Sequence, residues 1–159
     1  MRGLTLDEID VKLLTMLQAD GRISQHDLAE SVGLSSPATG ERLRKLEDRG
    51  FIKGFTAIVD PKPLGFDVTA FIAVGLDGSR FYQDFIERVQ AHPEIQECHT
   101  VTGQGSHLLK IRTGDTSTLE HLLAELQSWP GVNSTTTSIV LSALKEGTGL
   151  VLGDVPPES

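Results

Sequence analysis

The sequence predicts an α+β protein of two modules, and three observations point to this class. Amphipathic helical patterns with capping residues fill residues 5–50. A segment containing Pro and Gly, 60–65, interrupts the helical pattern. From residue 66 onward the patterns follow the order βαββαβ. We therefore predict a first domain at 1–60, a connecting strand to about 66, a second domain at 66–145 and a tail at 146–159.

The composition of the 159-residue chain is that of a soluble globular protein, with 38% apolar and 23% charged residues. The single cysteine, Cys98, excludes an intramolecular disulfide framework and suits a reducing compartment. No apolar run approaches the ~18 residues of a membrane-spanning helix, and no signal-type apolar core follows Met1. We therefore expect a cytoplasmic protein with no membrane partner.

The net charge of −8 is unevenly divided along the chain. Residues 1–60 carry eight Lys and Arg against ten Asp and Glu, whereas residues 61–159 carry six against twelve. An acidic total argues against a protein that coats nucleic acid through bulk charge. Because most of the acidity lies in the second domain, the first domain can still present a local DNA-binding surface.

Two helices are predicted at the start of the first domain from their capping residues. Thr5 and Glu8 form a capping-box pattern that begins the first helix. The apolar face of this helix consists of Ile9, Leu13, Met16 and Leu17. Ser24 caps the second helix, which ends at Gly33.

A third, longer helix begins at Ser35 or Ser36, with Pro37 in its first turn. Residues 51–59 follow it as a predicted strand or small ribbon. A helix, a short helix, a tight turn at Gly33 and a longer helix form the helix-turn-helix pattern, and the ribbon makes it winged. Such a unit inserts the N-terminal half of its last helix into the major groove of DNA.

The charge around the third helix is locally positive, because segment 41–53 carries five basic and three acidic residues. We expect residues 37–45 to read base edges while flanking side chains hold phosphates. The residues expected to hold phosphates are Ser24, Gln25, Arg42 and Lys53. The full set predicted to contact DNA is Ser24, Gln25, Ser35, Ser36, Pro37, Thr39, Gly40, Arg42, Arg44, Lys45 and Lys53. The alternative interpretation of these charges is a solvated helix face with ion pairs four residues apart.

The second domain is predicted as a ferredoxin-like sandwich, with two helices on one face of a four-stranded sheet. The predicted strands are 66–76, 95–102, 108–113 and 132–144. Ser79 caps the first of the two helices, and Ser117 with Glu120 forms a capping box for the second. The first strand is apolar on both faces, so we expect a partner subunit to cover the open face of the sheet.

Five stretches carry a specific pattern in register: 6–10 (LDEID), 17–24 (LQADGRIS), 28–35 (LAESVGLS), 42–47 (RLRKLE) and 50–52 (GFI). Together they resemble the Lrp/AsnC family of feast/famine transcriptional regulators, and the resemblance extends to about Lys145. It implies a winged helix-turn-helix joined to a ferredoxin-like ligand-response domain, with double-stranded DNA as a partner. It also implies homodimers that associate further, often to octamers, and many family members respond to amino acids.

The resemblance implies effector binding at the loop 102–107, where family members commonly carry Thr-Gly-Asp-aromatic-Asp. In this chain Gln104 and Ser106 replace both carboxylates. An α-ammonium group requires a carboxylate or several well-placed carbonyls, so a polar hairpin without a ligand is the alternative interpretation. The candidate effector-binding residues are Thr102, Gly103, Gln104, Gly105, Ser106, His107, Thr135 and Thr137.

We predict a sequence-specific DNA-binding transcriptional regulator, modulated by an amino acid or other small metabolite bound between protomers. No metal, cofactor or catalytic site is predicted, because Cys98 and His99 point to opposite faces of a strand and the other histidines lack metal-ligand spacing. One alternative is an architectural DNA-binding protein without an effector. Another is an enzyme similar to the sirohaem decarboxylases that resemble this family; those carry His- and Tyr-rich signatures near the third strand, whereas the only tyrosine here is Tyr82.

Overall fold

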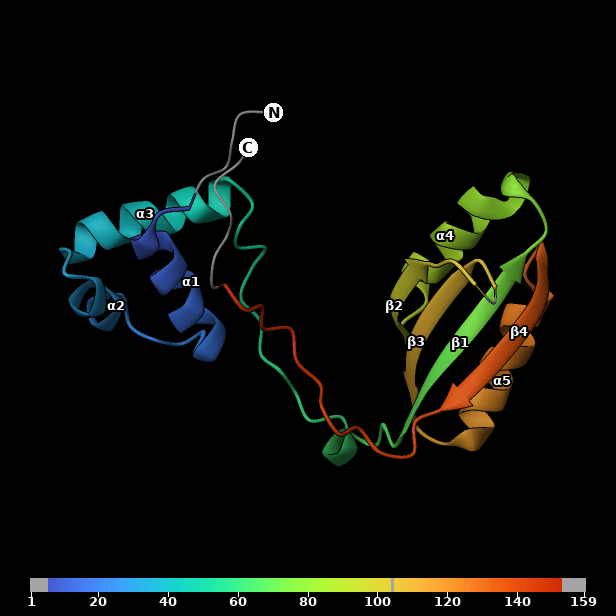
Figure 1. The fold of residues 1–159 in the computed structure, drawn as a ribbon. Coiled ribbons are helices and arrows are strands. Elements are labelled where there is room, and N and C mark those ends of the chain that lie inside the picture. Colours follow the sequence, from blue (N-terminus) through green and yellow to red (C-terminus); the bar gives the residue numbers. More distant parts are fainter. Residues whose placement is uncertain (1–5, 104, 153–159) are drawn as a thin grey trace. The chain divides into compact units, whose positions relative to one another are not determined.

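The computed structural model describes residues 6–103 and 105–152. The described part of the chain divides into two compact units, one of residues 6–58 with residues 146–152, and one of residues 59–103 with residues 105–145. The first unit is helical, and the second is a sheet with helices (Figure 1). Within the described residues, no helix is both long and apolar enough to cross a membrane.

The first unit contains three helices in the predicted order. They are α1 (Glu8–Ala19), α2 (Gln25–Val32) and α3 (Ser36–Asp48). Their apolar stripes meet in a small core whose buried members are Leu13, Leu14, Leu28, Ala29 and Leu46. Gly33 ends α2 at φ 69°, in the left-handed region where a side chain is strained. The turn at Gly33 leads into α3 and completes the helix-turn-helix.

The cap of α1 differs from the prediction. Asp7, and not Thr5, is the N-cap, and Thr5 lies outside the described residues. The Asp7 carboxylate accepts the Asp10 N–H at 2.8 Å, and the Asp10 carboxylate accepts the Asp7 N–H at 3.4 Å. The sequence contained two overlapping capping-box patterns, and α1 uses the one that begins two residues later.

The predicted strand or ribbon at 51–59 was wrong. No strand is assigned to this segment, and Phe55, Ile58 and Val59 are exposed. Aromatic and β-branched residues favour an extended backbone, but a strand also needs a neighbour with which to exchange hydrogen bonds. Within the described part of one chain, segment 51–59 has no such neighbour.

The second unit has the predicted order βαββαβ. Its elements are η1 (Lys62–Leu64), β1 (Val68–Leu76), η2 (Ser79–Phe81), α4 (Tyr82–Ala91), β2 (Ile95–Thr100), β3 (His107–Thr113), α5 (Thr116–Ser128) and β4 (Val132–Ile139). The strands lie in the order β2-β3-β1-β4, and every neighbouring pair is antiparallel. This topology brings the start of β3 and the middle of β4 to opposite sides of β1, where Val74 pairs with both His107 and Thr135.

Both helices of the second unit cover one face of the sheet. Figure 1 shows α4 and α5 beside the sheet. Ala70, Ile72 and Val74 of β1 are fully buried in the core that these helices form with the sheet. Alternate residues of β1 point to the other face, where Phe71 is 37% exposed. Phe71 lies in register between Lys110 and Ser138, so this open face is of mixed polarity.

Several predicted boundaries in the second unit were wrong. Ser79 does not cap α4, which follows a 3₁₀ turn and has no side-chain cap, and Asp115 with Thr118 forms the capping box of α5 in place of Ser117 with Glu120. β2 ends at Thr100, two residues early, and β4 ends at Ile139, five residues before the predicted end. β4 ends where it runs out of partner, since Ile139 pairs with Ala70 close to the start of β1.

The C-terminal segment returns to the first unit. The Gln18 side chain of α1 donates from Nε2 to the Leu150 carbonyl at 3.1 Å, and its Oε1 accepts the Leu150 N–H at 2.6 Å. The Gln18 amide therefore exchanges two hydrogen bonds with the peptide groups of Leu150, as paired residues of neighbouring antiparallel strands do. The described part of the predicted tail, 146–152, therefore belongs to the helical unit.

Candidate functional site

The N-termini of α2 and α3 are both capped by serines of the predicted DNA-contacting set. Ser24 accepts the Asp27 N–H at 3.1 Å, and Ser35 accepts the Ala38 N–H at 3.4 Å. Both serines are exposed. Because a helix N-terminus carries partial positive charge, two capped N-termini on the surface favour an anion such as phosphate.

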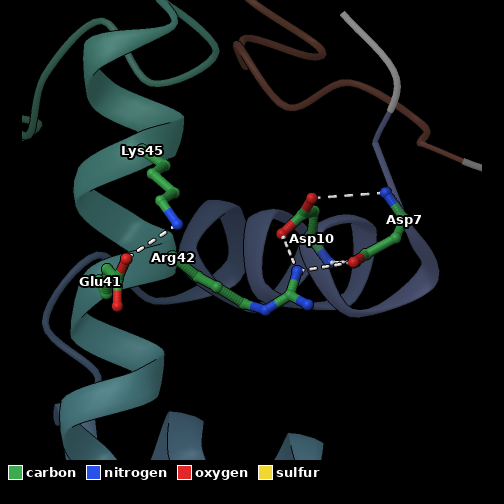
Figure 2. A network of polar contacts seen from close by, with 5 residues as sticks. All are labelled: Asp7, Asp10, Glu41, Arg42 and Lys45. Atoms are coloured by element: carbon green, nitrogen blue, oxygen red, sulfur yellow. Dashed lines mark hydrogen bonds and ion pairs between the residues drawn. The ribbon is translucent and has the colours of Figure 1, made fainter.

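The predicted groove-reading face of α3 is exposed at Pro37, Arg44 and Lys45. Lys45 forms an ion pair with Glu41 at 2.8 Å, and hydrogen bonding to Lys45 lowers the pKa of Glu41 (Figure 2). This pair is the i,i+4 contact of the alternative interpretation, but both partners are more than half exposed. Such a pair is weak and can exchange for a phosphate. Lys53, beyond the end of α3, is exposed as well.

The structure explains why α3 has a glycine at position 40. The Gln25 side chain crosses from α2 and donates from Nε2 to the Ser36 carbonyl at 2.6 Å. A Cβ added at Gly40 would lie 2.6 Å from that same nitrogen. Gly40 therefore makes room for the Gln25 amide between the two helices, and Gln25 and Ser36 serve packing of α2 against α3.

Thr39 requires a correction. Its side chain is fully buried, and its hydroxyl has no hydrogen-bond partner within the described residues. Thr39 lies at the interior face of α3 with Leu46, and a side chain in that position does not reach DNA. The helical spacing of Thr39 to Leu43 and Leu46 is three or four residues in each step, which indicates the buried face.

Arg42 lies in a polar network that joins α3 to the first turn of α1 (Figure 2). Its Nη1 donates to Asp7 Oδ2 at 2.6 Å and to Asp10 Oδ1 at 2.8 Å. These contacts raise the pKa of Arg42. Partial burial raises the pKa of Asp7, but hydrogen bonds from Asp10 N–H and Arg42 outweigh it and leave that pKa below its ordinary value. The structure thus commits the Arg42 guanidinium to an internal pair.

The candidate effector loop is fixed to the end of β1. Ser106 donates from its backbone N–H to the Val74 carbonyl at 2.9 Å, and its hydroxyl lies 3.3 Å from the same oxygen. Gly105, at φ 81°, lies so close that an added Cβ would meet that oxygen at 3.0 Å. Thr102 and Gly103 are exposed, and Gln104 lies outside the described residues.

His107 is buried at the start of β3, with 2% of its surface exposed. Its ring lies 4.9 Å from the Phe85 ring and 5.5 Å from the Tyr82 ring, and Nδ1 lies 2.9 Å from the Ser106 hydroxyl. Nε2 is buried without a partner among the described residues. Burial lowers the pKa of His107, so the ring is neutral near pH 7.

Thr135 and Thr137 lie on the helix side of β4. Thr135 accepts a hydrogen bond from Gln127 Nε2 of α5 at 3.0 Å, and both threonines are partly exposed. Thr135 and His107 are separated by one strand, since both pair with Val74. Neighbouring strands lie about 4.8 Å apart, so the two backbones are two such spacings, about 10 Å, apart, with the buried Val74 between them.

Sequence reasoning missed three features of these sites. It counted Asp10 only as an acid, although the spacing Asp7-x-x-Asp10 is a capping-box pattern and α1 buries Asp10. It also gave His107 no aromatic neighbours, because Tyr82 and Phe85 reach His107 only through the sheet topology. The exposed Gln18 carried no signal that it binds Leu150.

Comparisons with known proteins agree with this architecture. Family models match residues 6–53 as a winged helix-turn-helix DNA-binding domain and residues 69–150 as the Lrp/AsnC ligand binding domain. The leucine-responsive regulatory protein of Escherichia coli strain K12 is 42% identical over 153 residues, which cover 94% of this chain and 93% of that protein.

Two solved structures share the fold of nearly the whole chain. A transcriptional regulator from Neisseria meningitidis in complex with L-methionine has a TM-score of 0.89 at 34% identity, covering 94% of this chain and 98% of that one. A feast or famine regulatory protein from M. tuberculosis complexed with L-methionine has a TM-score of 0.84 at 32% identity, covering 89% and 96%. With both family models and these likenesses in agreement, the chain belongs to the Lrp/AsnC family and is a DNA-binding transcriptional regulator with a ligand-binding domain.

Proposed function

We propose that two copies of the chain bind one operator, and that each inserts the exposed face of α3 into a major groove. Pro37, Arg44 and Lys45 are the groove-facing residues in this proposal, whereas Gly40 faces the Gln25 amide. Phosphates are held by Lys53 and by the N-termini of α2 and α3, which Ser24 and Ser35 cap. The observation that carries the proposal is the pair of exposed, capped helix N-termini beside the exposed basic side chains of α3.

A two-fold dimer requires half-sites separated by whole turns of DNA, ~34 Å or a multiple of it. The open face of the sheet, with Phe71 partly exposed, is the surface that we propose the partner copy covers. Further association to octamers and a cytoplasmic location are part of the same proposal. Light scattering on the purified protein tests the assembly, because the chain mass is 17.2 kDa and each state is a multiple of it.

The DNA contacts are tested by the salt dependence of binding to a duplex that the wild-type protein enriches from a random pool. Arg44→Ala or Lys45→Ala weakens binding, and the slope of log affinity against log salt becomes shallower by about one unit if the residue meets a phosphate. Affinity and slope that stay the same in both variants would remove α3 from the interface.

We propose further that an amino acid or similar small metabolite binds near the 102–107 loop, between protomers; Thr135 and Thr137, whose side chains lie on the helix side of the sheet, face away from the surface that we propose the partner covers. The L-methionine complexes of the two structural relatives support this proposal, as does the fixed position of Ser106 on Val74. Bound ligand stabilises the folded state in proportion to the logarithm of its concentration above Kd. A thermal shift of several degrees with one of the standard amino acids supports an effector, whereas a flat panel favours an architectural DNA-binding role.

A further inference from the structure

We propose that Arg42, Asp7 and Asp10 form a positioning clamp. Arg42 does not bind DNA phosphate; it fixes the rotation and tilt of α3 against the first turn of α1. The proposal rests on the proposed role of α3 in the major groove. By charge alone, Asp7 and Asp10 would weaken DNA binding, whereas in the clamp they strengthen it.

The geometry of the clamp is specific. A single nitrogen, Arg42 Nη1, donates both of its protons, one to each carboxylate, at 2.6 and 2.8 Å (Figure 2). The two acids are themselves locked together by the capping box of α1. The Asp10 side chain is 11% exposed and the Asp7 side chain 51% exposed, so Asp10 is the buried anchor and Asp7 the outer one.

The local charge argues against a phosphate contact. The two carboxylates more than balance the charge of the Arg42 guanidinium, so Arg42 attracts a phosphate less than an unpaired cation would. Releasing Arg42 toward DNA would leave Asp10 nearly buried and without its cation, which is unfavourable. The retained pairing is therefore the lower-energy state in the complex as well as in the free protein.

The position of Arg42 along α3 explains why the clamp matters for DNA. Arg42 lies between Glu41 and Arg44 in sequence, on the flank of the helix that carries Lys45. A contact to a base edge depends on placement to within a fraction of an ångström. Holding one flank of α3 against α1 sets the direction in which its exposed face points.

The decisive comparison is between two neutralised acids, Asp10→Asn and Glu41→Gln, in the full-length protein. The probe is the labelled duplex that the wild-type protein enriches from a random pool. Removal of a negative charge near DNA should by electrostatics alone strengthen binding. We expect Glu41→Gln to bind as tightly as wild type or more tightly, and Asp10→Asn to bind about tenfold more weakly, which corresponds to ~1.4 kcal/mol. Unchanged or tighter binding by Asp10→Asn overturns the clamp.

A second comparison uses two neutralised bases, Arg42→Gln and Lys53→Gln. Lys53→Gln should make the salt slope shallower by about one unit, as expected for a lost phosphate contact. Arg42→Gln should weaken binding by about tenfold or more while the salt slope stays at the wild-type value. A slope that becomes shallower by about one unit in Arg42→Gln shows a phosphate contact and overturns the proposal.

Far-UV circular dichroism checks that each variant is folded. Arg42→Lys is the conservative control in case the other variants do not fold. Lys keeps the charge but cannot reproduce the planar fork of Arg, so the clamp predicts several-fold weaker binding at an unchanged slope, whereas a phosphate contact predicts little loss. If wild type enriches no sequence from the pool, the proposed function fails. The clamp proposal fails separately, through the variant comparisons on that duplex.

Discussion

Each unit of the molecule has a basic side chain at its candidate site that is partly or fully buried, Arg42 in the first unit and His107 in the second, and the two have opposite surroundings. Arg42 of the first unit meets two carboxylates within 2.8 Å, so its charge is kept and balanced. His107 of the second unit is enclosed by two aromatic rings and a hydroxyl, and no carboxylate contacts it among the described residues. Arg42 thus keeps a charge that two carboxylates balance, whereas the surroundings of His107 favour its neutral form.

Removal of the Phe85 ring, which contacts His107, should have the largest effect on stability. Phe85 is fully buried and contacts both His107 and Trp129, so Phe85→Ala should lower the free energy of unfolding of the second unit by about 3–5 kcal/mol. The only tryptophan, Trp129, reports on this unit through its fluorescence during urea unfolding. The core truncation Leu46→Ala, in the first unit, should leave the tryptophan transition in place. If it shifts that transition as much as Phe85→Ala, the units do not unfold separately.

The stabilities of the two units should respond to acid in different pH ranges. Burial lowers the pKa of His107, so the second unit has its full stability above the ordinary histidine pKa of 6.5 and loses stability as the pH falls below it. The pKa of Asp7 is also lowered, from an ordinary value of 3.8, so the contribution of Asp7 to the first unit is lost only as the pH falls below that value. Unfolding free energies measured between pH 8 and 5 should fall for wild type.

His107→Phe provides the control for the pH experiment, because it keeps an aromatic ring between Tyr82 and Phe85 and removes the titrating group. The variant should show a smaller decrease in stability across the same pH range, with Trp129 fluorescence as the measurement. An identical decrease in wild type and variant would mean that other groups carry the pH dependence.

Two glycines should differ in their cost of replacement. Both Gly33 and Gly105 have positive φ, and Ala in that conformation costs about 1–2 kcal/mol. Gly33 has open space around it, whereas a Cβ at Gly105 would meet the Val74 carbonyl at 3.0 Å. Chemical denaturation should therefore show a larger loss for Gly105→Ala in the second unit than for Gly33→Ala in the first. Equal losses would show that the loop moves easily away from β1.

The smallest effect is expected at Gly40. Ala in a helix interior is favoured over Gly by about 1 kcal/mol, but a Cβ here displaces the Gln25 amide from the Ser36 carbonyl. We expect Gly40→Ala to change stability by less than about 0.5 kcal/mol, because the two contributions offset each other. In a Gln25→Ala background the same substitution should stabilise by about 1 kcal/mol. A double-mutant cycle measured by thermal unfolding checks the difference.

The sequence predicted the helix-turn-helix because its signals are local. Ser24, Gly33, Ser35 and Pro37 act within one turn of the backbone, and the structure confirms each of them in its predicted place. The order βαββαβ along the chain was predicted for the same reason. The predicted ribbon at 51–59 failed because strand formation requires a neighbour that local sequence does not specify.

The site residues show the same division between local and tertiary information. Thr39 was placed among exposed residues although its spacing to Leu46 puts it on the buried face. The partners of Arg42 lie more than thirty positions away in the sequence, at Asp7 and Asp10, and nothing in the pattern of charges pairs them. Contacts of this kind follow from how helices pack, which sequence periodicity alone does not determine.

The pairing of Gln18 with Leu150 turns most of the chain into a ring. The two residues are 132 positions apart, and two hydrogen bonds at the surface close the loop between them. This closure is weak. Each surface hydrogen bond contributes about 1 kcal/mol, and the conformational entropy that the chain loses on closing opposes the closure. While these bonds are formed, two segments of the chain, 59–67 and 140–145, connect the helical unit to the sheet unit; when they break, the only folded connection among the described residues is the segment 59–67.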